Sequence, residues 1–111
     1  MRNLTKAALV ATLLAVPTTA FAECGKASWY SLPGQTTASG DPMNPNAMTA
    51  AHKTLPFGTV VNVVNQKTGK SVRVTINDRG PYVSGRIIDL SKAAAHKLGI
   101  IPTGTGRVCI S

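Results

Sequence analysis

The sequence predicts a small, mainly β protein, and it favours a closed barrel over an open sheet. Short β-type runs recur along the chain and are separated by turn residues such as glycine, proline and asparagine. One of these runs, residues 71–77, alternates strictly between apolar and polar side chains. So many short strands in so small a protein favour closure, because a closed barrel has no exposed strand edges. The expected strands are residues 26–31, 59–64, 71–77, 86–90 and 106–110.

The segments between these strands carry recognisable signals. Residues 66–70 form a turn in which Gly69 suits a positive φ, so the strands on either side are expected to form a hairpin. Residues 91–98 give the one clear helix signal, with Gly99 as its stop. Residues 35–50 are rich in Gly, Pro, Asn, Thr and Ser and are expected to form a long loop. Loops of this length in compact domains are often functional.

The first 22 residues have the pattern of a secretory signal peptide. Arg2 and Lys6 are followed by an apolar stretch at 7–16 and by small residues around a cleavage site after Ala22. The alternative is a transmembrane anchor, but the stretch is shorter than the roughly 20 apolar residues that a span needs. The expected organisation is therefore a signal peptide, 1–22, and one domain, 23–111, in a protein that is exported to the periplasm or secreted.

The two cysteines, Cys24 and Cys109, lie near the two ends of the expected mature domain. In an exported protein they are expected to form one disulfide, which would stabilise the fold by at most about 4–5 kcal/mol through loop closure. Two free buried thiols are the alternative. Glu23 precedes Cys24 where a lipid-anchored protein would have a small residue, so no stable membrane anchor is expected. The cysteines do not cluster with a histidine, and no metal site is expected.

Only four acidic residues are available for carboxylate chemistry. Asp78 follows the alternating strand, shares the parity of its apolar side chains and is expected at the barrel rim. The alternative is a structural Asp that accepts hydrogen bonds from turn amides. Asp89 ends another strand, and either it or Ser91 could cap the helix that follows. Asp41 precedes a proline, where a turn role is the simpler explanation.

Other candidates are few. His52 could donate or accept a proton, although a lone histidine is more often structural. Trp29 is expected in the core, Tyr30 could stack on a sugar, and His96 is expected on the surface. The sequence has no nucleophile elbow, zinc-protease, phosphate-loop or dinucleotide motif, and no cofactor is expected. A few carboxylates and one histidine near a groove are typical of enzymes that cleave glycosidic bonds.

Two long segments resemble a known family. TASGDPMNPNAMTAAHKTLPFGTVVNVVN and SVRVTINDRGPYVSGRIIDLSKAAAHKLG, with GKASWY before them, are similar to the double-psi β-barrel of the rare lipoprotein A family, which are lytic transglycosylases acting on peptidoglycan. The resemblance covers residues 25–110. It implies a six-stranded double-psi β-barrel with one or two short helices. The same barrel is similar to the first domain of expansins, which loosen cell walls without cleaving them.

The resemblance also implies site residues. Asp78 of NDRGP and His52 of TAAHKT match residues implicated in activity, Asp89 matches an essential groove residue of expansin-like barrels, and Asp41 stands where the family usually has Glu. Asp78 is expected to be the acid, with Asp41, Asp89 or His52 as its partner. The residues expected to bind substrate are Tyr30, Thr37, Ser39, Thr49, Arg79 and Tyr82.

The expected activity is lytic cleavage of the MurNAc–GlcNAc β-1,4 bond, leaving 1,6-anhydroMurNAc ends, by a monomer acting on peptidoglycan glycan strands. The formal charge is +8, and without Arg2 and Lys6 it is +6, which suits an anionic cell wall. No nucleic-acid partner is expected, because export and few aromatic residues argue against one. The alternative is a non-catalytic, expansin-like barrel that binds peptidoglycan. Met43 and Asn44 favour it, since the family usually has an aromatic residue and a carboxylate there.

Overall fold

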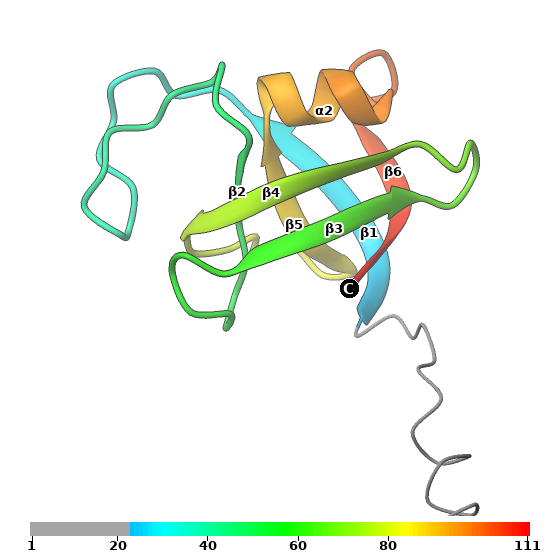
Figure 1. The fold of residues 1–111 in the computed structure, drawn as a ribbon, viewed down its shortest axis with the longest axis horizontal. Coiled ribbons are helices and arrows are strands. Elements are labelled where there is room, and N and C mark those ends of the chain that lie inside the picture. The colour runs from blue at the N-terminus through cyan, green and yellow to red at the C-terminus, as the bar shows by residue number, and fades with distance from the viewer. Residues whose placement is uncertain (1–22) are drawn as a thin grey trace, which may run out of the picture.

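The chain folds into a closed barrel of six strands with the order β1-β5-β2-β4-β3-β6, as the computed structural model shows for residues 23–111 (Figure 1). The expected signal peptide, 1–22, lies outside the described residues. The elements are β1 (Glu23–Tyr30), β2 (Thr49–Ala51), β3 (Val60–Asn65), β4 (Ser71–Asp78), β5 (Arg86–Ser91), α2 (Lys92–Leu98) and β6 (Thr105–Ile110). The expected β-barrel with a short helix is confirmed.

Two parallel pairs, β1 with β5 and β2 with β4, combine with four antiparallel pairs to close the barrel. The expected hairpin is β3–β4, and its turn contains Gly69 at φ +79°. All five expected strands are present, with ends displaced by up to three residues. The expected loop 35–50 was wrong at its end, because Thr49 and Ala50 belong to β2. Its three residues give no strand pattern, and β2 exists because β4 and β5 pair with it on both sides.

The barrel interior is filled by the apolar residues that the strand alternation predicted. Val72, Val74 and Ile76 of β4 are at most 4% exposed, and Trp29 packs against the same core. The helix α2 adds Ala94, Ala95 and Leu98 to this core. Ser91 caps the helix, with its Oγ accepting from the N–H of Ala94 at 3.2 Å, so the cap is not Asp89. Gly99 ends it at φ +83°, in the left-handed region that favours glycine.

The disulfide between Cys24 and Cys109 is confirmed. The two residues face each other in the antiparallel pairing of β1 with β6, so the bond joins neighbouring strands at the end of the barrel where Glu23 lies. His96 is exposed, as expected. Within residues 23–111, no helix has the length and apolar character needed to cross a membrane.

Candidate active site

Asp78 and Asp89 lie on either side of one small residue, Ala51. Ala51 of β2 is in register with Asp78 of β4 on one side and with Asp89 of β5 on the other. Neighbouring strands are about 4.8 Å apart, so the Cα atoms of the two aspartates are roughly 10 Å apart across the sheet. Ala51 is only 3% exposed and its side chain is short. The residue between the two carboxyl groups therefore carries no polar side chain of its own.

Three donors surround the Asp78 carboxylate. Its Oδ1 accepts hydrogen bonds from the backbone N–H groups of Ala38 and Arg79, each at 2.9 Å, and its Oδ2 accepts one from the Tyr30 hydroxyl at 2.9 Å. The alternative drawn from the sequence, an Asp that accepts a hydrogen bond from a turn amide, is present, since the N–H of Arg79 binds it. Oδ1 accepts two hydrogen bonds and Oδ2 accepts one, so Oδ2 retains a lone pair.

Asp89 lies in a drier environment. Its Oδ1 accepts a hydrogen bond from the Ser28 hydroxyl at 2.9 Å. Burial raises the pKa of Asp89 above its ordinary value, and the nearby negative charge of Asp78 raises it further, while the Ser28 hydrogen bond and Arg86 act in the opposite direction. Asp89 therefore keeps its proton to a higher pH than an ordinary aspartate does.

The Tyr30 hydroxyl lies close enough to Asp78 and Asp89 for both negative charges to affect its pKa. Burial raises its pKa, and so do its hydrogen bond to Asp78 and the negative charges of Asp78 and Asp89. The phenol thus remains neutral at any physiological pH. Tyr30 is a permanent hydrogen-bond donor to the site.

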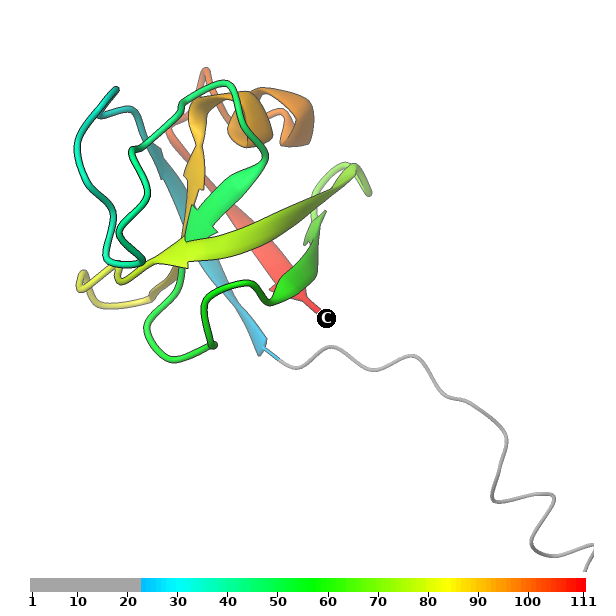
Figure 2. The same cartoon turned by 60° about the vertical axis from the view of Figure 1, so that its left-hand side comes forward.

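A loop from residues 32–48 lies beside the end of β4 (Figure 2). The N–H of Ser39 donates to the carbonyl of Asn77 at 3.2 Å, next to the Ala38–Asp78 contact. Within this loop, the Thr37 hydroxyl donates to the Asp41 carbonyl, and Ser39 Oγ donates to Asp41 Oδ2 at 3.3 Å. The structure therefore brings the loop to Asp78. The exposed Asp41 carboxylate makes its hydrogen bond within the loop.

The two unusual residues of this loop have local roles. Met43 is 4% exposed and is part of the buried surface. The Asn44 side chain accepts a hydrogen bond from the N–H of Asn46 at 2.9 Å, which is a common turn arrangement. Neither side chain makes a hydrogen bond to Asp78 or Asp89.

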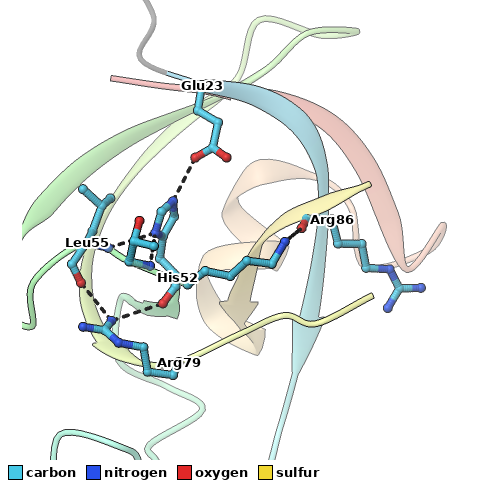
Figure 3. Close-up of polar contacts among 7 residues, drawn as sticks. Glu23, His52, Leu55, Arg79 and Arg86 are labelled. Atoms are coloured by element: carbon cyan, nitrogen blue, oxygen red, sulfur yellow. Dashed lines mark hydrogen bonds and ion pairs between the residues drawn. The ribbon is translucent and has the colours of Figure 1, made fainter. Parts of the chain in front are cut away.

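The side chain of His52 makes its hydrogen bonds to Glu23, Thr54 and Leu55 and makes none to Asp78 or Asp89. Figure 3 shows the contact with Glu23. The Nδ1 of His52 accepts from the N–H groups of Thr54 and Leu55, both at 3.1 Å, so the ring proton lies on Nε2 and is donated to Glu23 Oε1 at 2.9 Å. The imidazole is almost fully buried. Only its backbone meets the site strand, where the His52 N–H donates to the Asp78 carbonyl at 3.1 Å.

The Arg79 side chain makes its contacts with other residues of the protein. Its Nη1 donates to the carbonyls of His52 at 3.1 Å and Leu55 at 2.8 Å (Figure 3). Its guanidinium lies 4.0 Å from the centre of the Phe57 ring. Tyr82, in contrast, is 77% exposed on the β4–β5 loop and is free to stack on a ligand. Thr49 begins β2, two positions before Ala51.

Two contributors to this site were not predicted from the sequence: Ser28 and Ala38. Ala38 acts through its backbone N–H, which has no sequence signature. Ser28 could have been found from its place two residues before Tyr30 on the first strand. Among residues 23–111, no three His, Cys, Asp or Glu side chains come close enough to hold a metal ion.

A comparison with protein-family models finds one described as "Lytic transglycolase" over residues 22–110. The chain belongs to this lytic transglycolase family. The match confirms the resemblance on the NDRGP and TAAHKT segments, and the barrel is the double-psi β-barrel that it implied.

Curated relatives of this lytic transglycolase domain are similar over most of its length. The endolytic peptidoglycan transglycosylase RlpA of Neisseria meningitidis is 53% identical over 92 residues, which are 81% of this chain and 38% of that protein. RlpA of Pseudomonas aeruginosa is 55% identical over 91 residues, 80% of this chain and 27% of that protein. The probable RlpA of Synechocystis is 54% identical over 88 residues. The chain therefore spans well under half of the length of these relatives.

Solved structures with the same fold include two of different kinds. A Streptomyces papain inhibitor covers 85% of this chain and 97% of its own at a TM-score of 0.65 and 23% identity, a likeness of fold alone. An expansin of Clavibacter michiganensis covers 79% of this chain and 48% of its own at a TM-score of 0.63 and 28% identity. A mutant of that expansin was solved in complex with cellohexaose.

Proposed function

We propose that this domain is a peptidoglycan lytic transglycosylase that cleaves the MurNAc–GlcNAc β-1,4 bond. The observation that carries the proposal is the pair of carboxyl groups, Asp78 and Asp89, on either side of Ala51 with Tyr30 hydrogen-bonded to one of them. Two carboxyl groups flanking a scissile bond are the equipment of glycosidic cleavage. The family membership and the names of the curated relatives support the same activity.

In the proposed reaction, protonated Asp78 Oδ2 donates its proton to the bridging oxygen between MurNAc and GlcNAc. The bond from that oxygen to the anomeric carbon of MurNAc breaks, and GlcNAc leaves with a hydroxyl group. The C6 hydroxyl of the same MurNAc attacks the anomeric carbon and loses its proton to the Asp78 carboxylate or to Asp89. The products are a 1,6-anhydroMurNAc end and a free GlcNAc end. Water is not consumed, so the reaction is that of a lyase.

Electrostatics support this order of events. The anomeric carbon becomes positively charged as the bond breaks, and negative carboxylates nearby stabilise that charge. The Tyr30 hydroxyl donates to Oδ2 of Asp78 at 2.9 Å, so it stabilises the carboxylate that remains once Asp78 has given up its proton. Asp89, with its raised pKa, is the alternative group that accepts the proton of the C6 hydroxyl. In this scheme His52 and Arg79 position the segment next to Asp78, and Tyr82 supplies a surface for a sugar ring.

The site of action follows from the proposed substrate. Peptidoglycan lies outside the cytoplasmic membrane, so the proposal requires export, with residues 1–22 as the signal peptide and the domain working in the periplasm or after secretion. The chain has far more basic than acidic residues, which favours adsorption to an anionic wall.

The test is a digestion with matched variants. Purified 23–111 protein is incubated with intact and amidase-stripped peptidoglycan, and soluble products are identified by mass spectrometry. We expect 1,6-anhydroMurNAc fragments, their loss in Asp78→Asn, and a smaller effect of Asp41→Asn, because the exposed Asp41 makes no hydrogen bond to the carboxyl pair. Cleavage by Asp78→Asn at the parent rate would refute the acid assignment.

A second function, non-catalytic binding of peptidoglycan, is favoured by Asn44. Its side chain is tied to the Asn46 amide and brings no carboxylate to the loop. The likeness to an expansin supports a groove that accepts a glycan strand. The same digestion separates the two functions. A binding barrel would sediment with the sacculi and release no soluble product.

A further inference from the structure

A cavity of about 350 Å³ lies at the opposite end of β4 from Asp78. It is bounded by the β3–β4 turn on one side and by the connection from α2 to β6 on the other, which lie at the same end of the barrel in Figure 1. The eight residues of β4 separate the two ends by roughly 23 Å. The lining residues are Asn65, Lys67, Thr68, Gly99, Ile100, Thr103, Thr105, Gly106 and Arg107.

The charge around this cavity is entirely positive. Lys67 and Arg107 line it, and all four acidic residues of the chain, Glu23, Asp41, Asp78 and Asp89, lie elsewhere. Among the described residues the one ion pair joins His52 to Glu23, so neither Lys67 nor Arg107 has a carboxylate partner there. Residues 1–22 contain no acid that could supply one. The two cations therefore face an opening without any negative charge of the protein.

A third cation, Lys70, has a structural explanation and is set apart from these two. Its Nζ lies 3.5 Å from the position that a Cβ on Gly99 would take, beside the C-terminus of α2. The carbonyl groups at that end of a helix attract a positive charge. Gly99, the C-cap of α2, also lines the cavity, so the end of the helix is close to Lys67 and Arg107 as well. Among the described residues, neither of these two side chains makes a hydrogen bond to a carbonyl of the helix.

The walls of the cavity suit a small polar ligand. Ile100 is 2% exposed and provides an apolar wall against which Gly106 packs, since a Cβ at 106 would lie 2.7 Å from Ile100 Cγ2. Thr68, Thr103 and Thr105 also line the cavity. The Thr103 hydroxyl donates to the Thr105 carbonyl at 2.7 Å, and the Thr68 hydroxyl accepts from the N–H of Lys70 at 3.2 Å. A volume of a few hundred Å³ with a small number of polar groups is usual for small-molecule sites.

We propose that this cavity binds a carboxylate group of the cell-wall polymer, held by Arg107 and Lys67. A guanidinium offers paired N–H donors that match a carboxylate, and an ammonium adds a second charge. Two parts of peptidoglycan carry such a group: the lactyl ether of a muramic acid freed of its peptide, and the C-terminus of a peptide stem. The choice of polymer rests on the proposed function. The cavity lies too far from Asp78 to contact the sugar being cleaved, so it retains the polymer and takes no part in bond breaking.

The test is a titration of the 23–111 protein followed by backbone amide NMR, in two matched pairs of probes. N-acetylmuramic acid is compared with N-acetylglucosamine, which lacks the lactyl carboxylate. Acetyl-D-alanyl-D-alanine is compared with its C-terminal amide. We expect saturable shifts at Gly99, Ile100 and Gly106 with one or both acids and none with the neutral partners. The acid that binds identifies which part of the polymer the cavity takes.

Variants test whether the chemical-shift changes in the titration depend on Lys67 and Arg107. Lys67→Gln/Arg107→Gln is expected to weaken binding of the acid at least tenfold. Lys53→Gln/Lys92→Gln removes the same charge from exposed positions outside the cavity and is expected to leave binding unchanged. Equal shifts with the neutral probes, no shift with either acid, or unchanged binding by Lys67→Gln/Arg107→Gln would each overturn the proposal. Asp78→Asn should bind the acid normally, so a failed digestion and a failed titration are separate results.

Discussion

The hydroxyl group of Tyr30 donates a hydrogen bond to Oδ2 of Asp78 at 2.9 Å. The two residues are 48 positions apart in the chain and meet because Tyr30 ends β1 and Asp78 ends β4. The phenol is held neutral by burial and by the carboxylates near it, which raise its pKa. The proposed acid therefore always has a donor beside the oxygen that would carry the proton.

Tyr30→Phe is expected to lower transglycosylase activity about tenfold or more, because a hydrogen bond to a charged group contributes about 1.5–3 kcal/mol. The ring and its packing are retained, but the same hydrogen bond stabilises the folded protein, so the two proteins are compared at a temperature well below both melting temperatures. The rate of release of soluble muropeptides measures the effect. Activity within twofold of the parent would show that the hydroxyl does not assist Asp78.

Asp89→Asn is expected to change how stability depends on pH. The folded-state pKa of Asp89 is raised above its ordinary value of 3.8, so the folded protein binds more protons than the unfolded chain between that value and the raised pKa. The parent protein thus loses stability from this group as the pH rises through that window. Asn cannot ionise. The free energy of unfolding of the variant minus that of the parent should therefore be larger at pH 7 than at pH 3. Urea unfolding at both pH values tests this, and an identical difference at the two would contradict it.

His52→Ala and His96→Ala form a matched pair. His52 is 5% exposed and its ring takes part in three hydrogen bonds, whereas His96 is an exposed residue of α2. Loss of the His52 ring is expected to destabilise the fold by about 2–3 kcal/mol, because each hydrogen bond contributes about 1 kcal/mol. The His96 variant should be within about 0.5 kcal/mol of the parent, as most surface substitutions are. Denaturant unfolding of both variants is the measurement. Similar stability of the two would show that the His52 contacts contribute nothing.

Replacing Cys24 and Cys109 by Ser is expected to destabilise the domain by up to about 4–5 kcal/mol, because the bond closes a loop with a sequence separation of 85. An 89-residue domain has little stability to spare, so the variant should melt well below the parent. Calorimetry of the two proteins measures the difference. Reduction of the parent with a thiol should reproduce the melting point of the variant, and a parent unaffected by reduction would contradict the expectation.

The fold could largely be predicted from the sequence because its signals are local. Alternation in β4, the glycine turn before it and the caps of α2 each depend on residues close together in the chain. Strand β2 could not be predicted, since Thr49, Ala50 and Ala51 become a strand through pairing with β4 and β5. The disulfide was predictable from two cysteines alone.

The sequence predicted candidate residues but not the contacts between them. Asp78 and Tyr30 were both expected in the candidate site, and the hydrogen bond between them depends on the barrel order. The Ala38 amide that binds Asp78 has no residue-type signal, because every residue but proline carries the same group. The contact of His52 with Glu23 could not be predicted either, because it joins residues 29 positions apart in the chain.

The hydrogen bond from the Ala38 N–H to Asp78 Oδ1 gives one carboxyl group two duties. It exchanges the proton in the proposed reaction, and it holds the loop of residues 32–48 beside the end of β4. A charged acceptor binds an amide more strongly than a neutral one. In the proposed reaction, the contact between this loop and Asp78 is therefore weaker while Asp78 is protonated and stronger once it has given up its proton. Proton transfer and the attachment of the loop are then coupled within each turnover.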